Sequence, residues 1–143
     1  MINNKILKAV IFDLDGVVTD SAKYHYLAWK SLADELGIPF DEEYNEKLKG
    51  ISRTESLELI LKNGNSETKY SASEKEKLAD RKNEHYKELI KEIKPSDMLP
   101  GIENFLNDLK SHNIKTALAS VSKNANFIIK QLQAEKYFDY IAD

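Results

Sequence analysis

A largely apolar run over residues 6–12 ends abruptly in Asp13-Leu14-Asp15-Gly16, and this junction most constrains how the chain can fold. The run is rich in β-branched residues and too short to span a membrane, so it predicts a buried strand. Side chains two positions apart on a strand point the same way. We therefore expect Asp13 and Asp15 to face one site at the carboxyl end of that strand, where Gly16 supplies the freedom for a turn.

Two carboxylates this close repel each other, and a cation between them or a proton on one of them relieves the repulsion. Proteins hold Mg²⁺ through one or two carboxylates together with phosphate oxygens. The pair Asp13 and Asp15 therefore predicts a carboxylate nucleophile beside an acid/base, with Mg²⁺ and a phosphoryl group. Taken alone, the same residues are also typical of a turn whose carboxylates only cap backbone groups.

Composition narrows the class of partner. The chain has 143 residues, a formal net charge of −3 and no basic block, which argues against nucleic acid. It has no cysteine, so disulfides and thiolate metal sites are excluded. Neither a signal peptide nor an apolar stretch of transmembrane length is evident, so we expect a cytoplasmic protein without a membrane partner.

After the acidic motif the pattern is helical for about seventy residues. Apolar periodicity predicts a helix over residues 22–36, and residues 41–48 are expected to form a short polar helix that ends near Gly50. A capping box formed by Ser52 and Glu55 opens a third helix, and a second box formed by Ser73 and Glu76 opens a long fourth one. Four helices with short connections predict a small antiparallel bundle.

Strand character returns after Pro100, with a helix over 102–109, a strand over 114–119, a helix through Leu132 and a strand over 138–142. This order predicts an α/β fold in which a helical cap interrupts a parallel-sheet core. We place the core at residues 1–20 and 95–143 and the cap at residues 21–94.

A second cluster of polar residues follows the second predicted strand. Ser120 can hydrogen-bond a phosphate oxygen, and Ser122, Lys123 and Asn124 add donors and a cation where a helix begins. An ordinary helix cap beside a solvated lysine is the alternative. Arg53 lies in the first turn of a helix, where a cation is unfavourable, so it is either a phosphate ligand or simply solvated.

Residues 12–20 resemble the first motif of the haloacid dehalogenase (HAD) superfamily, and Ser120 matches the second motif. The rest of the chain resembles the β-phosphoglucomutase family within that superfamily. The matching residues are His25, Trp29, 48–53, 81–83, 99–101 and 117–124. The resemblance implies a Rossmann-like HAD core of parallel strands with an inserted four-helix cap.

The resemblance also implies an activity and a role for each residue. β-Glucose 1-phosphate and glucose 6-phosphate would be interconverted through β-glucose 1,6-bisphosphate, with Asp13 as the phosphorylated nucleophile, Asp15 as the acid/base, and both at the Mg²⁺ site. Thr19 and His25 would assist hinge closure and orient Asp15, and Ser120 would hold the transferring phosphoryl group. The residues implied to bind the sugar and its other phosphate are Leu48, Lys49, Gly50, Arg53, Lys82, Val121, Ser122, Lys123 and Asn124.

Two other functions stay open. A HAD phosphatase of a small phosphorylated metabolite would share the acidic pair, Ser120 and Mg²⁺. An inactive fragment is the other alternative, because family members carry a lysine motif and acidic metal ligands beyond the point where this sequence stops, at Asp143. We therefore expect the chain to match the amino-terminal two-thirds of a protein that is monomeric at full length. Alone, it would leave its first strand as an exposed apolar edge.

Overall fold

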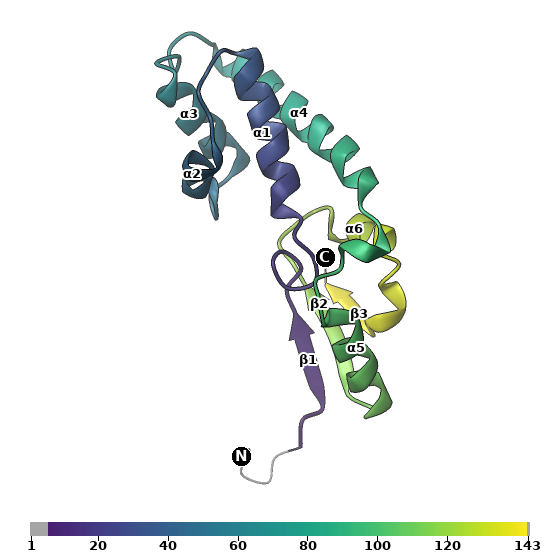
Figure 1. The fold of residues 1–143 in the computed structure, drawn as a ribbon. Coiled ribbons are helices and arrows are strands. Elements are labelled where there is room, and N and C mark those ends of the chain that lie inside the picture. Colours follow the sequence, from purple (N-terminus) through teal and green to yellow (C-terminus); the bar gives the residue numbers. More distant parts are fainter. Residues whose placement is uncertain (1–5, 143) are drawn as a thin grey trace. The chain divides into compact units, whose positions relative to one another are not determined.

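A computed structural model describes residues 6–142, in which several helices separate the first strand from the second and one α-helix separates the second strand from the third (Figure 1). These residues separate into two compact units, one containing the part up to Ala22 together with Ile90 onward, and the other running from Lys23 to Leu89. The predicted α/β class is confirmed. No helix in residues 6–142 is long and apolar enough to cross a membrane.

The first unit is built on a parallel sheet with strand order β1-β2-β3. Its strands are β1 (Ala9–Phe12), β2 (Lys115–Ala119) and β3 (Tyr140–Ala142), and its helices are α5 (Ile102–Ser111) and α6 (Ala125–Gln131). Phe12 contacts Phe105 of α5 and Phe138 edge-on, with ring centroids 5.7 and 6.0 Å apart. Phe12 and Phe138 are buried on one face of the sheet, whereas Phe105 at its margin is 45% exposed. Short 3₁₀ helices complete the unit: η2 (Ile90–Glu92), η3 (Pro95–Asp97) and η4 (Glu135–Tyr137).

The first strand is shorter and less buried than the apolar run over residues 6–12 predicted. Ile6 is 80% exposed and Ile11 is 72% exposed. Ile11 and Tyr140 both pair with Ala117 and so share a sheet face, and Tyr140 is exposed as well. A continuous apolar run predicts cover on both faces, but within residues 6–142 only the Phe12 face is covered. As expected, β1 forms an edge of the described sheet.

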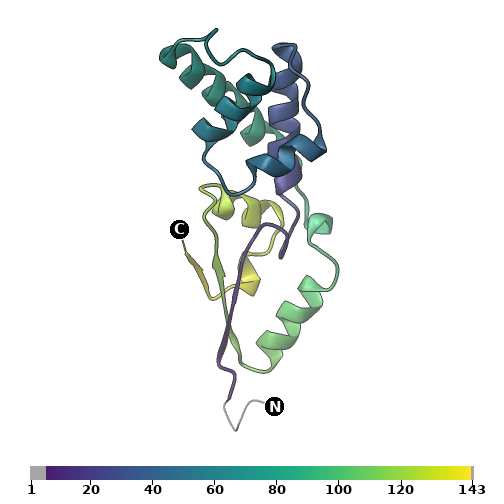
Figure 2. The same ribbon diagram turned by 90° about the vertical axis from the view of Figure 1, so that its left-hand side faces the viewer.

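The second unit consists of α1 (Ala22–Glu35), α3 (Arg53–Asn63) and α4 (Ala72–Leu89), with the shorter α2 (Glu42–Asn45) and η1 (Glu46–Leu48) (Figure 2). Side chains from these elements and their connections form one apolar core. Trp29, Leu32 and Ile60 belong to this core. Gly37 adopts a φ of 71°, and Ile38 donates back to the carbonyl of Ala33 over 2.9 Å. This left-handed cap explains why α1 ends where it does.

Of the two predicted capping boxes, the N-cap at Ser52 is confirmed and the position of the second box is wrong. Glu55 N–H donates to Ser52 Oγ over 3.1 Å, and the Ser52 hydroxyl contacts the Glu55 carboxylate at 3.2 Å. The long helix is capped by Ser71 rather than Ser73, since Glu74 N–H donates to Ser71 Oγ and Ser71 N–H to Glu74 Oε1, both over 3.1 Å. α4 therefore begins two residues earlier than the sequence pattern indicated.

The two segments that connect the sheet-containing unit with residues 23–89 are bonded to each other. Thr19 is 2% exposed, and its hydroxyl donates to the Asp97 carbonyl oxygen over 2.7 Å. Leu99 N–H donates to the Val18 carbonyl over 2.8 Å, and Thr19 forms an antiparallel bridge with Met98. The outgoing and returning segments thus meet at Thr19.

Candidate active site

The acidic motif forms a tight turn directly after β1. Gly16 has a φ of 75°, and its N–H donates to the Thr19 carbonyl over 2.8 Å. Leu14 and Val18 are fully buried and anchor the turn, whereas Asp13 and Asp15 are exposed. The turn therefore holds its two carboxylates at the carboxyl end of the strand, where a ligand can reach them.

The two carboxylates have different surroundings. Asp13 Oδ1 accepts a 2.7 Å hydrogen bond from Leu14 N–H, which fixes the carboxylate plane. Asp15 remains accessible to solvent, yet partial burial raises its pKa, and the negative charges of Asp13 and Asp20 raise it further. A carboxylate whose plane is held by a backbone donor suits a nucleophile, and a neighbour whose pKa is raised suits a general acid.

Ser120 lies at the same edge of the sheet. Phe12 pairs with Leu118 in the parallel register, so Asp13 and the residues that follow β2 emerge at adjacent strand ends. Ser120 Oγ accepts from Ser122 N–H over 3.1 Å, and Ser122 Oγ accepts from Asn124 N–H over 3.2 Å. Each hydroxyl oxygen accepts a hydrogen bond from the loop, so its proton is available to donate to a bound oxygen. Val121 and Lys123 are exposed on the same loop.

The second unit holds a buried cation. Lys82 is 4% exposed, and its Nζ lies 2.8 Å from His25 Nδ1. The ammonium also lies over the rings of Trp29 and Tyr86, 4.7 and 5.2 Å from their centroids. The His25 ring stacks on Tyr86 at 3.9 Å with an interplanar angle of 10°. The ammonium is thus surrounded by rings, and its hydrogen-bond partner is an imidazole nitrogen.

Burial controls the charge states in this cluster. Together with the positive charge of Arg53, which acts in the same direction, burial lowers the pKa of Lys82 to about 8. Burial also lowers the pKa of His25 to about 4, with Lys82 contributing in the same direction. At neutral pH, Lys82 is therefore mostly charged and His25 is neutral.

Arg53 and residues 48–50 lie on the same unit. Arg53 is the exposed first residue of α3, and within residues 6–142 it makes no ion pair. Leu48 is buried, Lys49 pairs with Glu46 at 2.9 Å, and Gly50 adopts a φ of 79°. The unpaired guanidinium and the buried ammonium of Lys82 give this unit cationic groups without an anionic partner in the described residues.

The predicted site residues therefore form two groups, each within one unit. Sequence reasoning missed two members of these neighbourhoods. Tyr86, whose ring stacks on that of His25, lies one helical turn after Lys82. That spacing predicts that Lys82 and Tyr86 lie on the same face of the helix. Ser21 is 1% exposed at the start of α1, and its hydroxyl has no hydrogen-bond partner among the described residues. No sequence signal distinguishes Ser21 from an ordinary helix cap.

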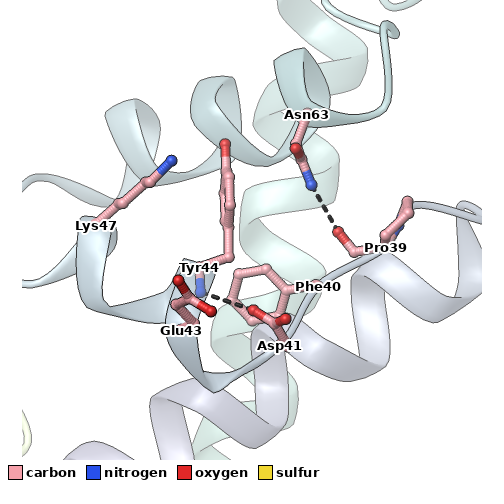
Figure 3. A pocket seen from close by; sticks show the side chains of 7 residues that line it. All are labelled: Pro39, Phe40, Asp41, Glu43, Tyr44, Lys47 and Asn63. Atoms are coloured by element: carbon pink, nitrogen blue, oxygen red, sulfur yellow. Dashed lines mark hydrogen bonds between the residues drawn. The ribbon is translucent and has the colours of Figure 1, made fainter.

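Among the cavities lined by described residues of the second unit, two are of similar size. One of about 280 Å³ is framed by hydrogen bonds from Asn63 to the Pro39 carbonyl and from Tyr44 N–H to Asp41, and none of the predicted site residues lines it (Figure 3). The other, of about 270 Å³, lies between α1 and α4 and is lined partly by Lys82. Only the second cavity therefore touches a predicted site residue.

Comparison with known proteins finds relatives that match most of this chain. The family model of the haloacid dehalogenase-like hydrolases matches residues 10–143. The β-phosphoglucomutase of Bacillus subtilis (strain 168) is 55% identical over 137 residues, covering 96% of this chain and 61% of that protein. A "Phosphorylated carbohydrates phosphatase" of Thermotoga maritima is 31% identical, covering 93% of this chain and 59% of that protein.

Solved structures give the same result. The crystal structure of β-phosphoglucomutase from Clostridium difficile superposes with a TM-score of 0.81 at 52% identity, covering 96% of this chain and 62% of that one. The chain thus spans about three-fifths of the length of these relatives. The resemblance found in the sequence is confirmed, and the match of the family model over residues 10–143 shows that the chain belongs to the haloacid dehalogenase-like hydrolase family.

Proposed function

We propose that the protein containing this chain is a β-phosphoglucomutase, which interconverts β-D-glucose 1-phosphate and D-glucose 6-phosphate through β-glucose 1,6-bisphosphate. One observation carries the proposal. The chain is 55% identical to a β-phosphoglucomutase, and its two aspartates, Asp13 and Asp15, lie with Ser120 at one edge of the sheet. It also holds two cations, Arg53 and Lys82, that have no anionic partner within residues 6–142. A bisphosphate intermediate needs binding groups for two phosphates.

The chemistry follows from the different surroundings of the two aspartates. A carboxylate oxygen of Asp13 attacks phosphorus of the bisphosphate, and the bond from phosphorus to the sugar oxygen breaks. That sugar oxygen takes the proton held by Asp15, whose raised pKa favours the protonated form. In the reverse direction a sugar hydroxyl gives its proton to Asp15 and attacks the phosphoryl group on Asp13. Atoms and charges balance over the cycle.

The residues present fit Mg²⁺, although they do not enclose it. Asp13 and Asp15 offer oxygen ligands, and their mutual repulsion favours a cation. Within residues 6–142, no group of three or more acidic or histidine side chains is placed to hold a metal. Asp13 and the main-chain carbonyl of Asp15 would hold the ion, with phosphate oxygens and water as further ligands. When bound, Mg²⁺ neutralises charge on the phosphoryl oxygens.

The remaining site residues take binding roles in this proposal. Ser120 holds the transferring phosphoryl group through its free hydroxyl proton. Arg53, with Ser122, Lys123 and Asn124, binds the distant phosphate, while Leu48, Lys49 and Gly50 line the sugar and Lys82 contacts it. Thr19 and His25 support hinge closure and orient Asp15. A cap that closes would exclude water, so that phosphate passes to a sugar hydroxyl and not to solvent.

The phosphatase alternative rests on the Thermotoga maritima relative and has less support, at 31% identity against 55%. A coupled assay separates the two functions. The longest gene product containing this sequence is supplied with β-glucose 1-phosphate, Mg²⁺ and a trace of bisphosphate. We expect glucose 6-phosphate to form with little inorganic phosphate, and Asp13→Asn to abolish the phosphorylated enzyme. Rapid phosphate release without glucose 6-phosphate would favour the phosphatase.

A further inference from the structure

We propose that Asn63 is a site of spontaneous deamidation, and that its conversion to aspartate or isoaspartate detaches residues 37–41 from the end of α3. The reaction needs no substrate and is independent of the proposed function. Asn63 is the only asparagine in the sequence that glycine follows. Because glycine has no side chain, its amide nitrogen can approach the preceding side chain without steric hindrance. Asn63 is also exposed, so water can reach it.

Packing explains why glycine follows Asn63. The end of the helix does not need Gly64 for its conformation, because Asn65 takes the left-handed cap position, with a φ of 53°. A Cβ on Gly64 would lie 2.5 Å from Cγ1 of Ile38, which is only 4% exposed. The buried isoleucine has little room to move, so only glycine fits at position 64 without a shift. The reactive pair is therefore a consequence of how residues 37–41 pack on α3.

The side chain of Asn63 fastens the same segment. Its Nδ2 donates to the carbonyl oxygen of Pro39 over 2.8 Å (Figure 3). An amide nitrogen is a donor, whereas both oxygens of an ionised carboxylate are acceptors. After deamidation a carboxylate would face the Pro39 carbonyl, and repulsion would replace the hydrogen bond. In isoaspartate the main chain also gains one carbon at this position, which displaces the carboxylate. Either product therefore loses the bond that holds residues 37–41.

The reaction is a cyclisation followed by hydrolysis. The backbone nitrogen of Gly64 loses its proton and attacks Cγ of Asn63, and the bond from Cγ to Nδ2 breaks. Nδ2 leaves as ammonia, and the product is a five-membered succinimide. Water then opens the ring at Cγ, which gives aspartate, or at the main-chain carbonyl of residue 63, which gives isoaspartate. The sum is one water consumed and one ammonia released, without oxidation or reduction.

The end of α3 controls how fast the ring can close. Gly64 N–H donates to the Leu61 carbonyl over 3.1 Å, and the Asn63 amide is held by Pro39. Both bonds must break before the nitrogen can reach Cγ, so the reaction proceeds through opening of the last helical turn. Asn65→Gly favours the left-handed cap and should keep that turn closed for longer.

Mass spectrometry in ¹⁸O-labelled water tests the site. The longest gene product containing this sequence is aged at mildly alkaline pH, which favours the deprotonated nitrogen, and is then cleaved with trypsin after Lys62 and Lys69. We expect ¹⁸O to enter position 63, partly as isoaspartate, well ahead of Asn65 and Asn83. Asn65→Gly should slow this labelling. No label at position 63, or labelling of Asn65 at the same rate, would overturn the assignment of the site, and an unchanged rate in Asn65→Gly would overturn control by the helix end.

Hydrogen exchange tests the detachment. Asn63→Asp should speed the exchange of the Ile38 and Tyr44 amides by about two- to tenfold, the usual worth of one hydrogen bond. Wild-type protein should approach these rates as it ages. Asn63→Gln is the matched control, because its longer amide cyclises far more slowly, and its exchange rates should not change with age. Wild-type exchange rates in Asn63→Asp would show that the bond to Pro39 does not hold the segment. Neither measurement depends on whether the protein proves to be a mutase or a phosphatase.

Discussion

The hydroxyl of Thr19 donates a 2.7 Å hydrogen bond to the carbonyl oxygen of Asp97, a residue 78 positions further along the chain. We expect Thr19→Val, which keeps the shape and removes the donor, to lower the free energy of unfolding by about 1 kcal/mol. Hydrogen exchange should quicken at Thr19 and Leu99, the amides next to this bond. Thr19→Ser keeps the hydroxyl and is the control. Equal exchange in the valine and serine variants would show that the bond contributes nothing.

The cap of α4 gives a prediction with a built-in control. Ser71→Ala removes the side chain that accepts from Glu74 N–H, so it should cost about 1 kcal/mol of stability. Ser73→Ala lies inside the helix and should change stability by less than about 0.5 kcal/mol. Urea denaturation of the two variants compares them directly. A larger loss for Ser73→Ala would restore the capping position that the sequence pattern first suggested.

Lys82 should lower stability in the absence of a ligand. The unfolded chain keeps the lysine proton up to a pKa of 10.5 and the folded chain releases it near 8, so wild-type stability should rise as the pH increases between these values. Lys82→Met removes the buried charge and should stabilise the chain at pH 7 by at most about 3 kcal/mol. Denaturation at pH 7 and at about pH 10.5 measures both effects. A methionine variant that is less stable at pH 7 would contradict the prediction.

Asp139 should make the chain sensitive to acid. Its Oδ2 accepts from Thr116 N–H over 2.9 Å, and this bond, helped by Lys115, lowers the pKa of the carboxyl below 3.8. The carboxylate therefore stabilises the fold above pH 3.8, and that contribution is lost as the pH falls through the lowered value. Asp139→Asn should be destabilised at pH 7 and should approach wild type near pH 2. Asp80→Asn, on the exposed side of α4, is the control. A destabilisation that is equal at both pH values would assign the loss to packing.

Arg53 gives a functional prediction. Arg53→Ala in the longest gene product should weaken sugar phosphate binding by about ten- to a hundredfold, the usual worth of a charged hydrogen bond. Phosphorylation of Asp13 by acetyl phosphate should persist, since that donor has no second phosphate. Lys62→Ala removes another cation from α3 and should leave both measurements unchanged. A parallel loss of both reactions would make Arg53 structural.

Local rules predicted most of the secondary structure. The strand before Asp13, the Ser52 cap and the end of the first helix near residue 36 all depend on neighbouring residues, and the structure confirms them. The second capping box failed because Ser71 and Ser73 are both followed by a glutamate three residues later. Propensity could not decide between them, because the choice depends on where the preceding loop meets the bundle.

Long-range relationships were beyond the sequence. His25 and Lys82 are 57 residues apart, and no local pattern indicates that one accepts a hydrogen bond from the other. The exposure of Ile11 shows the same limit, since an apolar strand is buried only where another element covers it. The positions of Asp13 and Ser120 at one sheet edge were predictable, because parallel strands bring their carboxyl ends together.

The bonds between Val18 and Leu99 and between Thr19 and Asp97 have a consequence for how proteins of this kind diversify. The intervening segment leaves and returns at points already within hydrogen-bonding distance, 2.8 and 2.7 Å. A segment whose ends coincide can be lengthened, exchanged for another, or replaced by a short linker without altering the register of β1 and β2. Residues 23–89 can therefore be exchanged as a unit, and such an exchange could change the substrate preference while the residues at the sheet edge, with the chemistry proposed for them, stay the same.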